Sequence, residues 1–205
     1  MNDIVIDTGI RAKHREMIKV AAIDLVKEMG INQLTLSLLS KKAGVPANTT
    51  KGLFVNEQEV LLGSCIQCFA KMTAILFRSN LRDSTLNQGL QSVWLNYQLF
   101  SNRYAKEATF IQQFLRDPSA LYGTGSRANL RKLLQPFIGY LSYQKRHPVS
   151  DVQALMIITL LGNNAGNGEI ALMEDGGYSS RQVFFTSLLP KIEKILELPI
   201  YDLAC

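Results

Sequence analysis

Apolar residues recur at three- and four-residue spacing through nearly the whole of this 205-residue chain, as they do in helices that pack one face against a core. The clearest series consists of Leu86, Leu90, Val93, Trp94, Tyr97 and Phe100. No segment of useful length alternates apolar and polar residues as a half-buried strand does. The sequence therefore predicts an all-α protein, and 47% apolar residues are enough for a sizeable core.

The formal net charge of +5 favours an anionic partner, such as nucleic acid or an acidic membrane surface. The positions of the charges narrow this choice. No Asp or Glu occurs between Glu28 and Glu57, whereas Lys41, Lys42 and Lys51 all fall in that window. We therefore expect that an anion can approach this part of the chain without meeting a carboxylate.

Several classes of protein are disfavoured by what the sequence lacks. The first residues have neither the basic flank nor the apolar run of a signal peptide, and no stretch reaches the roughly 18 apolar residues of a membrane span, so we expect a cytoplasmic protein with no membrane partner. Three cysteines are not a secreted disulfide framework, and Cys65 and Cys68 lie mid-helix, which favours buried thiols over a redox pair. His14 and His147 are far apart, and no catalytic or cofactor motif occurs, so we expect no metal, no cofactor and no enzymatic activity.

Breaks in the helical pattern delimit helices in the first third of the chain, which we expect at residues 11–29, 36–42, 46–54 and 57–77. Thr35 is a good N-cap for the second of them, and Asn56 with Glu59 forms a capping-box arrangement at the start of the fourth. Gly44 ends the second helix, and Pro46 suits the first turn of the third. A short helix, a glycine turn and another short helix thus follow each other directly.

Two short helices joined in this way can form a helix-turn-helix, in which the second lies in the major groove of DNA while the first braces it. Leu38, Leu39 and Phe54 are expected to face inward. The leading positions of the second helix hold Ala47, Asn48, Thr49 and Lys51. Asn can bond an adenine edge, Thr can meet a thymine methyl group, and Lys can bond guanine or phosphate. Taken alone, the same pattern also fits a polar corner of any helical bundle.

The wider sequence from Arg15 to Leu61 resembles the N-terminal domain of the TetR (tetracycline repressor) family of bacterial transcription regulators. The resemblance is carried by IKVAAIDLVKEMGINQLTL, LLSKKAGVP and NTTKGLFVNEQEVL, in that order. It implies a three-helix helix-turn-helix DNA-binding domain over residues 1–56 and a C-terminal helical bundle for ligand binding and dimerisation over residues 57–205. It also implies a homodimeric repressor that binds a palindromic operator in double-stranded DNA and responds to a small-molecule effector.

On this interpretation Thr35 and Lys42 position the protein on phosphates, and the start of the second short helix faces base edges. The expected DNA-binding residues are Thr35, Lys42, Pro46, Ala47, Asn48, Thr49 and Lys51. The basic segment RAKHR, residues 11–15, is either an arm that reaches the DNA backbone or minor groove, or a solvated tail.

The chain departs from residues common in the family at Ser40, Asn48, Thr50, Lys51 and Glu57. Where Glu57 stands, the family commonly has a Lys that would touch a phosphate. Two hypotheses follow. The protein reads an unusual operator through Asn48, Thr49 and Lys51, or it is a helical dimer with degenerate DNA binding that acts through ligand or protein contacts.

Aromatic residues concentrate in the middle helices of the chain. Most such residues are core, because aromatic side chains dominate protein interiors. Some of them can line an apolar cavity with a few polar groups, which is the usual composition of a small-molecule site. The candidates are Trp94, Tyr97, Phe114, Phe137 and Tyr140.

The segment from Ala154 to Leu161 is apolar all round, so a single neighbouring helix cannot bury it. It is followed by a last helix, expected at residues 180–197, in which Pro190 should produce a kink. We predict that these two helices form the dimer interface, with Leu155, Ile158, Leu161, Phe184 and Leu188 as contacts. The alternative is that the apolar helix is the central helix of a monomer.

Overall fold

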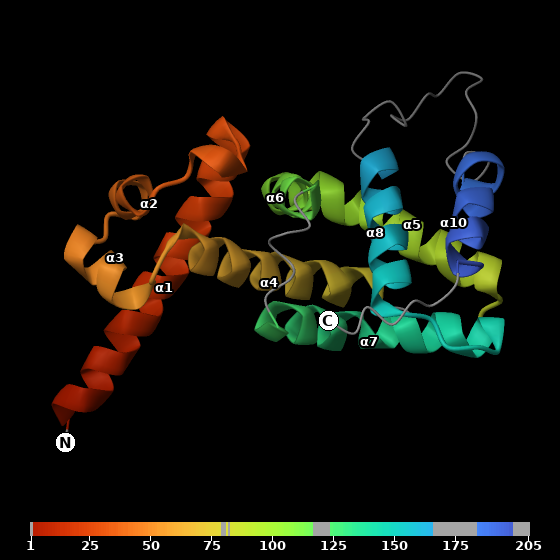
Figure 1. The fold of residues 1–205 in the computed structure, drawn as a ribbon, viewed down its shortest axis with the longest axis horizontal. Coiled ribbons are helices and arrows are strands. Elements are labelled where there is room, and N and C mark those ends of the chain that lie inside the picture. The colour runs from red at the N-terminus through yellow and green to blue at the C-terminus, as the bar shows by residue number, and fades with distance from the viewer. Residues whose placement is uncertain (1, 79–80, 82, 117–123, 166–183, 199–205) are drawn as a thin grey trace. The chain divides into compact units, whose positions relative to one another are not determined.

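The structure is a computed structural model that describes residues 2–78, 81, 83–116, 124–165 and 184–198. Throughout these residues the secondary structure is helix and turn, and the described part of the chain contains no strand (Figure 1). The predicted all-α fold is therefore confirmed, and the elements divide into two compact units that are described separately below.

The first unit comprises Met1–Phe69 and Lys106–Arg127, and the second comprises Ala70–Ala105 and Ala128–Cys205. By packing, the first unit therefore extends past residue 56 and also contains most of a helix from the middle of the chain. The predicted division of function, with DNA binding in residues 1–56 and ligand binding with dimerisation in residues 57–205, stays a prediction.

Four helical elements open the first unit. They are α1 (Asn2–Met29), the 3₁₀ turn η1 (Ile31–Gln33), α2 (Leu36–Ala43) and α3 (Ala47–Leu53). Helices α2 and α3 lie beside α1 and pack against it and against each other (Figure 1). Helix α1 starts well before the predicted position near Arg11, because no proline interrupts the preceding residues and Gly9 is tolerated within a helix.

The turn between α2 and α3 is held by hydrogen bonds within the motif. Gly44 has a φ of 65°, in the left-handed region that favours glycine, and its N–H donates to the Lys41 carbonyl. The buried hydroxyl of Ser40 donates to the carbonyl of Val45, and the Val45 N–H donates back to the carbonyl of Ser40. The hydroxyl of the buried Thr50 donates to the carbonyl of Pro46 at 3.3 Å. Two of the departures from the family pattern, Ser40 and Thr50, thus stabilise the turn from inside.

The remaining helices are α4 (Glu57–Leu76), α5 (Leu86–Arg103), α6 (Ala105–Arg116), α7 (Thr124–Lys145), α8 (Asp151–Ala165), the π-helical turn η3 (Phe184–Leu188) and α10 (Leu189–Leu196). The predicted cap of α4 is present, because Glu59 N–H donates to Asn56 Oδ1 at 3.0 Å and Glu59 Oε2 accepts from Val55 N–H at 2.8 Å. Thr85 and Gln88 form a capping box at the start of α5.

The second unit is built around α5 and α8, and α10 packs on α8. The predicted apolar series of α5 is buried from Leu90 to Phe100. Helices α5 and α8 approach closely where Tyr97 meets Gly162, since a Cβ atom added at Gly162 would lie 2.6 Å from the Tyr97 hydroxyl oxygen. A larger residue at that position would therefore hold the two helices apart.

The end of the chain differs from the single kinked helix predicted for residues 180–197. Residues 180–183 lie outside the described residues. From Phe184 the chain forms the π turn η3 and then α10, in which Pro190 stands in the first turn. Because η3 runs directly into α10, Pro190 lies at the junction of the π turn and the α-helix, where the regular i to i−4 hydrogen bonding is already interrupted.

Candidate nucleic-acid interface

Helix α3 has one apolar side and one polar side. Leu53 and Thr50 are buried beneath it, whereas Ala47, Asn48 and Lys51 are exposed. Thr49 is half-buried, and Pro46 is exposed at the N-cap position. The helix therefore presents short polar groups and one cation outward from a buried support, which is the arrangement that a groove-reading helix needs.

The two predicted phosphate contacts lie at opposite ends of α2. Thr35 is exposed at its N-cap, where Oγ1 accepts from the Leu38 N–H at 3.2 Å. Lys42 is exposed at its other end and forms an ion pair with Glu28 of α1, with 2.6 Å between Nζ and Oε1. An exposed pair of this kind contributes only about 0–1 kcal/mol and is screened by salt, so a phosphate can compete with Glu28 for Lys42.

The expectation that an anion would meet no carboxylate in this region is wrong. Glu28 and Glu57 flank the acid-free window in the sequence, but both fold back onto α2. Oε1 of Glu57 accepts from the Leu36 N–H at 2.9 Å, at the first residue of that helix. Among the described residues, Lys41 and Lys51 make no ion pair, so they are the cations of the window with free charge.

Leu38 also differs from the prediction that it faces inward. Its side chain is 36% exposed, whereas Leu39 is fully buried. The packed side of α2 is formed by Leu39 and Ser40, and Leu38 lies at its edge.

The basic segment at residues 11–15 is neither a flexible arm nor a tail, because it lies within α1. Nη2 of Arg15 donates to the carbonyl of Leu53 at 2.9 Å, and its guanidinium lies 5.3 Å from the centre of the Phe54 ring. Nη2 of Arg11 donates to the carbonyl of Gly52 at 3.3 Å. Both cations meet the C-terminal end of α3, where the helix dipole favours positive charge, and they fix α3 against α1.

Helix α6 is also attached to the end of α1. Gln113 accepts from the Ile31 N–H through Oε1 at 3.2 Å and donates through Nε2 to the Val26 carbonyl at 3.4 Å. Lys106 forms an ion pair with Asp24 at 2.6 Å. No local pattern in the sequence marks these contacts, since they join residues more than 80 positions apart.

The five predicted ligand-binding residues are all buried, but they do not gather in one unit. Phe114 belongs to the first unit, and Trp94, Tyr97, Phe137 and Tyr140 belong to the second. The Tyr140 hydroxyl donates to the Thr85 carbonyl at 2.8 Å, and burial raises the pKa of this side chain. The buried Trp94 Nε1–H has no hydrogen-bond partner among the described residues.

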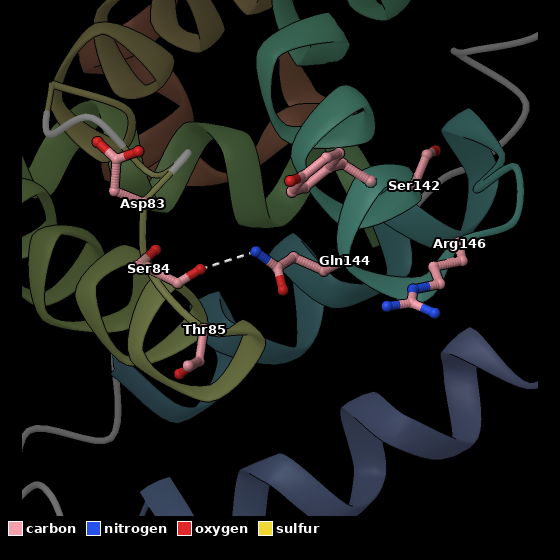
Figure 2. Close-up of a pocket in the computed structure, with 7 residues that line it drawn as sticks. Asp83, Ser84, Thr85, Ser142, Gln144 and Arg146 are labelled. Atoms are coloured by element: carbon pink, nitrogen blue, oxygen red, sulfur yellow. Dashed lines mark hydrogen bonds between the residues drawn. The ribbon is translucent and has the colours of Figure 1, made fainter.

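A hollow of about 660 Å³ opens in the second unit between the start of α5 and the end of α7 (Figure 2). Its walls carry polar groups, and Gln144 Nε2 donates across it to the Ser84 carbonyl at 2.7 Å. The lining residues are Asp83, Ser84, Thr85, Ser142, Tyr143, Gln144 and Arg146. None of the predicted ligand-binding residues lines this hollow, so the predicted ligand site stays a prediction.

Four of the five predicted dimer contacts are fully buried within the chain, namely Ile158, Leu161, Phe184 and Leu188. A side chain with no exposed surface cannot contribute area to an interface in this conformation. Of the predicted contacts only Leu155 is partly exposed. The large apolar side chains left exposed on α8 and η3 are Val152 (41%), Met156 (40%) and Phe185 (36%).

Helix α4 carries the two neighbouring cysteines, and both are buried thiols. Burial raises the pKa of the Cys65 thiol well above its ordinary value, and the nearby Cys68 adds to this shift, so the reactive thiolate form is disfavoured.

Within the described residues α4 is also the one helix long and apolar enough to cross a membrane. Half of that stretch is buried in the chain, as expected for a core helix.

The fold defined by these units is a helix-turn-helix supported by a long first helix, followed by a larger helical body. No protein-family model matches the sequence, and no curated protein matches it. Solved structures do match. A TetR-family regulator from Shewanella sp. PV-4 superposes with a TM-score of 0.63 at 12% identity, over 74% of this chain and 83% of that one. A TetR-family regulator from Haemophilus influenzae superposes with a TM-score of 0.59 at 17% identity, over 91% and 98%.

A third structure, the regulator FadR from Bacillus subtilis in complex with stearoyl-CoA, superposes with a TM-score of 0.55 at 17% identity, over 89% of this chain and 97% of that one. Across these structures the common property is the fold. The chain thus has the fold of the TetR-family transcriptional regulators, as the resemblance of residues 15–61 implied.

Proposed function

We propose that this chain is a cytoplasmic, ligand-responsive, homodimeric transcriptional regulator that represses by binding a palindromic operator, and that it is not an enzyme. The observation that carries the proposal is the exposed polar side of α3 on a helix fixed at both ends. Gly44 and Ser40 set the turn before α3, and Arg15 holds its last carbonyl group. A helix held in this way enters a groove with little loss of conformational freedom on binding.

In this proposal Asn48, Thr49 and Lys51 contact base edges, and Thr35 and Lys42 contact phosphates. Pro46 and Ala47 form the leading end of α3 and allow close approach to the DNA, since neither projects a long side chain. Lys42 exchanges Glu28 for a phosphate when DNA binds. A pair of α3 helices related by a two-fold axis would lie about 34 Å apart, which is one turn of DNA.

The proposed dimer surface is the exposed apolar strip on α8, made of Val152, Leu155 and Met156, which share one face of the helix, and Phe185 of η3 is a further exposed apolar side chain. The buried residues Ile158, Leu161, Phe184 and Leu188 support this strip from inside the chain. An exposed cluster of large apolar side chains is costly in water, and an isologous contact between two copies removes it from solvent.

The effector site is proposed within the second unit, among Trp94, Tyr97, Phe137 and Tyr140, where the Trp94 N–H, which has no partner among the described residues, is a polar group for a ligand to satisfy. Helix α5, which carries Trp94 and Tyr97, ends at Arg103, and α6 follows at Ala105. A ligand that displaces α5 therefore acts on α6, whose Gln113 and Lys106 hold the end of α1. Such a ligand shifts the protein only if it binds one form more tightly than the other. Because the FadR structure holds stearoyl-CoA, long-chain acyl-CoA thioesters are the first effectors to test.

The test of the proposal is selection of bound fragments from random duplex DNA, repeated with Asn48→Ala and Lys51→Ala. We expect the wild-type chain to recover a palindrome and each variant to lose preference at particular positions of it. Recovery of fragments with no common sequence by the wild-type chain would reject operator binding. The second hypothesis, a helical dimer with degenerate DNA binding, is favoured by the carboxylates of Glu28 and Glu57, which bond to residues of α2, and weak binding with a small salt dependence would support it.

A further inference from the structure

The first turn of α2 is already bound to an anion that belongs to the chain itself. Oε1 of Glu57, at the start of α4, accepts from the Leu36 N–H at 2.9 Å. The Leu38 N–H, two residues on, donates to Thr35 Oγ1. Two of the first three N–H groups of α2 are therefore satisfied within the protein before any DNA is present, and the Ser37 N–H between them has no partner among the described residues.

This arrangement conflicts with the role proposed for the same turn. The first N–H groups of a helix, together with its dipole, form a site for an anion such as phosphate. The proposed function places Thr35 and the start of α2 on a DNA phosphate. A carboxylate and a phosphate cannot both accept from the Leu36 N–H, and two negative charges in one place repel each other.

We infer that Glu57 is an internal competitor for the backbone phosphate of DNA, and that it holds the affinity of the helix-turn-helix below what α2 and α3 would otherwise provide. This inference rests on the proposed function, because it concerns the strength of DNA binding. Glu57 does not itself read a base. It acts through the first turn of α2 and reduces the energy that phosphate contacts contribute on any sequence.

The neighbouring Glu59 shows that this contact is not ordinary capping of α4. Glu59 accepts from the Val55 N–H just before its own helix, and its backbone N–H donates to Asn56. Glu57 lies two residues earlier, on the first residue of α4, and its carboxylate is directed to a different helix. Glu59 therefore provides a matched control with the same charge on the same helix turn, and among the described residues its hydrogen bonds are to Val55 and Asn56 rather than to α2.

The experiment compares the wild-type chain with Glu57→Gln, Glu57→Ala and Glu59→Gln. The Gln variant keeps an oxygen that can accept from the Leu36 N–H, so α2 keeps its bond while the charge is removed. The Ala variant also frees the N–H for a phosphate. Dissociation constants are measured by fluorescence anisotropy on a random-sequence duplex and on the selected palindrome over a series of salt concentrations, and thermal unfolding of each variant checks that it is folded.

We expect Glu57→Gln to bind both duplexes about 2- to 10-fold more tightly per half-site at low salt, because a like charge beside a phosphate is removed. Glu57→Ala should bind at least as tightly as Glu57→Gln, because it also frees the Leu36 N–H for a phosphate oxygen, and the two variants should show the same dependence of log Kd on log salt because they carry the same charge. Glu59→Gln should change the affinity by less than about 2-fold, because Glu59 accepts from the Val55 N–H and does not occupy the donor that a phosphate would use on α2.

Three outcomes separate the inference from the proposed function. If the wild-type chain binds DNA and Glu57→Gln binds no more tightly than Glu59→Gln, the inference is wrong and the proposed function stands. If the wild-type chain binds weakly or not at all and Glu57→Gln binds measurably, the inference is supported in its strongest form. If neither chain binds either duplex, both the inference and the proposed function are wrong.

Discussion

The contact between Tyr97 and Gly162 gives the sharpest test of whether the second unit uses its aromatic residues as core. A Cβ atom at Gly162 would lie 2.6 Å from the Tyr97 hydroxyl oxygen and 3.0 Å from Cζ, well inside van der Waals contact. Tyr97 is 1% exposed, so its ring lies inside the unit and any movement must be taken up by neighbouring core residues. Gly162→Ala should therefore force apart α5 and α8, whose tight packing depends on that glycine.

The size of this effect follows from two opposing terms. Overpacking a core costs about 1–3 kcal/mol, and replacing a helical glycine by alanine returns about 1 kcal/mol. Gly139, within α7, has no atom within 4 Å of an added Cβ and is exposed. Gly139→Ala should therefore gain the stability that alanine adds to a helix without any cost of overpacking. The two variants should thus differ by about 1–3 kcal/mol in free energy of unfolding, although the substitution is the same.

Thermal unfolding followed by circular dichroism measures this difference. For a chain of this size about 1 kcal/mol corresponds to roughly 2–4 °C in Tm. We expect Gly139→Ala to raise Tm by a few degrees and Gly162→Ala to leave it unchanged or lower it. An equal rise in Tm for both variants would show that Tyr97 moves freely, which would refute the packing argument and favour an open cavity at Tyr97.

Three further perturbations test other parts of the structure. Gln113→Leu removes both hydrogen bonds between α6 and the end of α1, and should lower the free energy of unfolding by about 1–2 kcal/mol in urea titration; an unchanged midpoint would mean that these bonds contribute nothing. The raised pKa of Cys65 keeps its thiol neutral in the folded state, so folding stability is full below the ordinary thiol pKa and declines as pH rises through the higher folded value. Native protein at pH 8 should therefore resist iodoacetamide at Cys65 while urea-unfolded protein is alkylated, as mass spectrometry would show, and rapid native alkylation would contradict this. Met156→Glu should dissociate the dimer in sedimentation experiments without lowering Tm, whereas Ile158→Glu should unfold the chain; a dimer that survives Met156→Glu would place the interface elsewhere.

Local patterns in the sequence predicted the helices and several of their ends, because caps and apolar spacing act over a few residues. Thr35, Asn56 and Glu59 cap where expected, and Gly44 ends α2 as predicted. The start of α1 was placed too late, since nothing before Arg11 either requires or forbids a helix.

The contacts that position the candidate site were not predictable in this way. Arg15, Glu57 and Gln113 each bond the backbone of a helix that is distant in sequence, and a single charged or amide residue carries no local signal of its partner. The all-round apolar character of α8 correctly indicated burial, but it could not distinguish inward from outward residues. Ile158 faces the chain interior, whereas Met156 faces out.

The central claim is that α3 reads a DNA sequence, and the most direct measurement is the affinity of Asn48→Ala for the selected palindrome. Equilibrium titration should compare wild type and variant on that palindrome, on a duplex with the half-site bases changed one at a time, and on scrambled DNA, all at one salt concentration. The account predicts that wild type discriminates the palindrome from scrambled DNA, and that Asn48→Ala loses about 1–3 kcal/mol of that discrimination at one base pair per half-site while retaining nonspecific binding. Equal wild-type affinity for palindrome and scrambled DNA, or an unchanged base preference in Asn48→Ala, would contradict it.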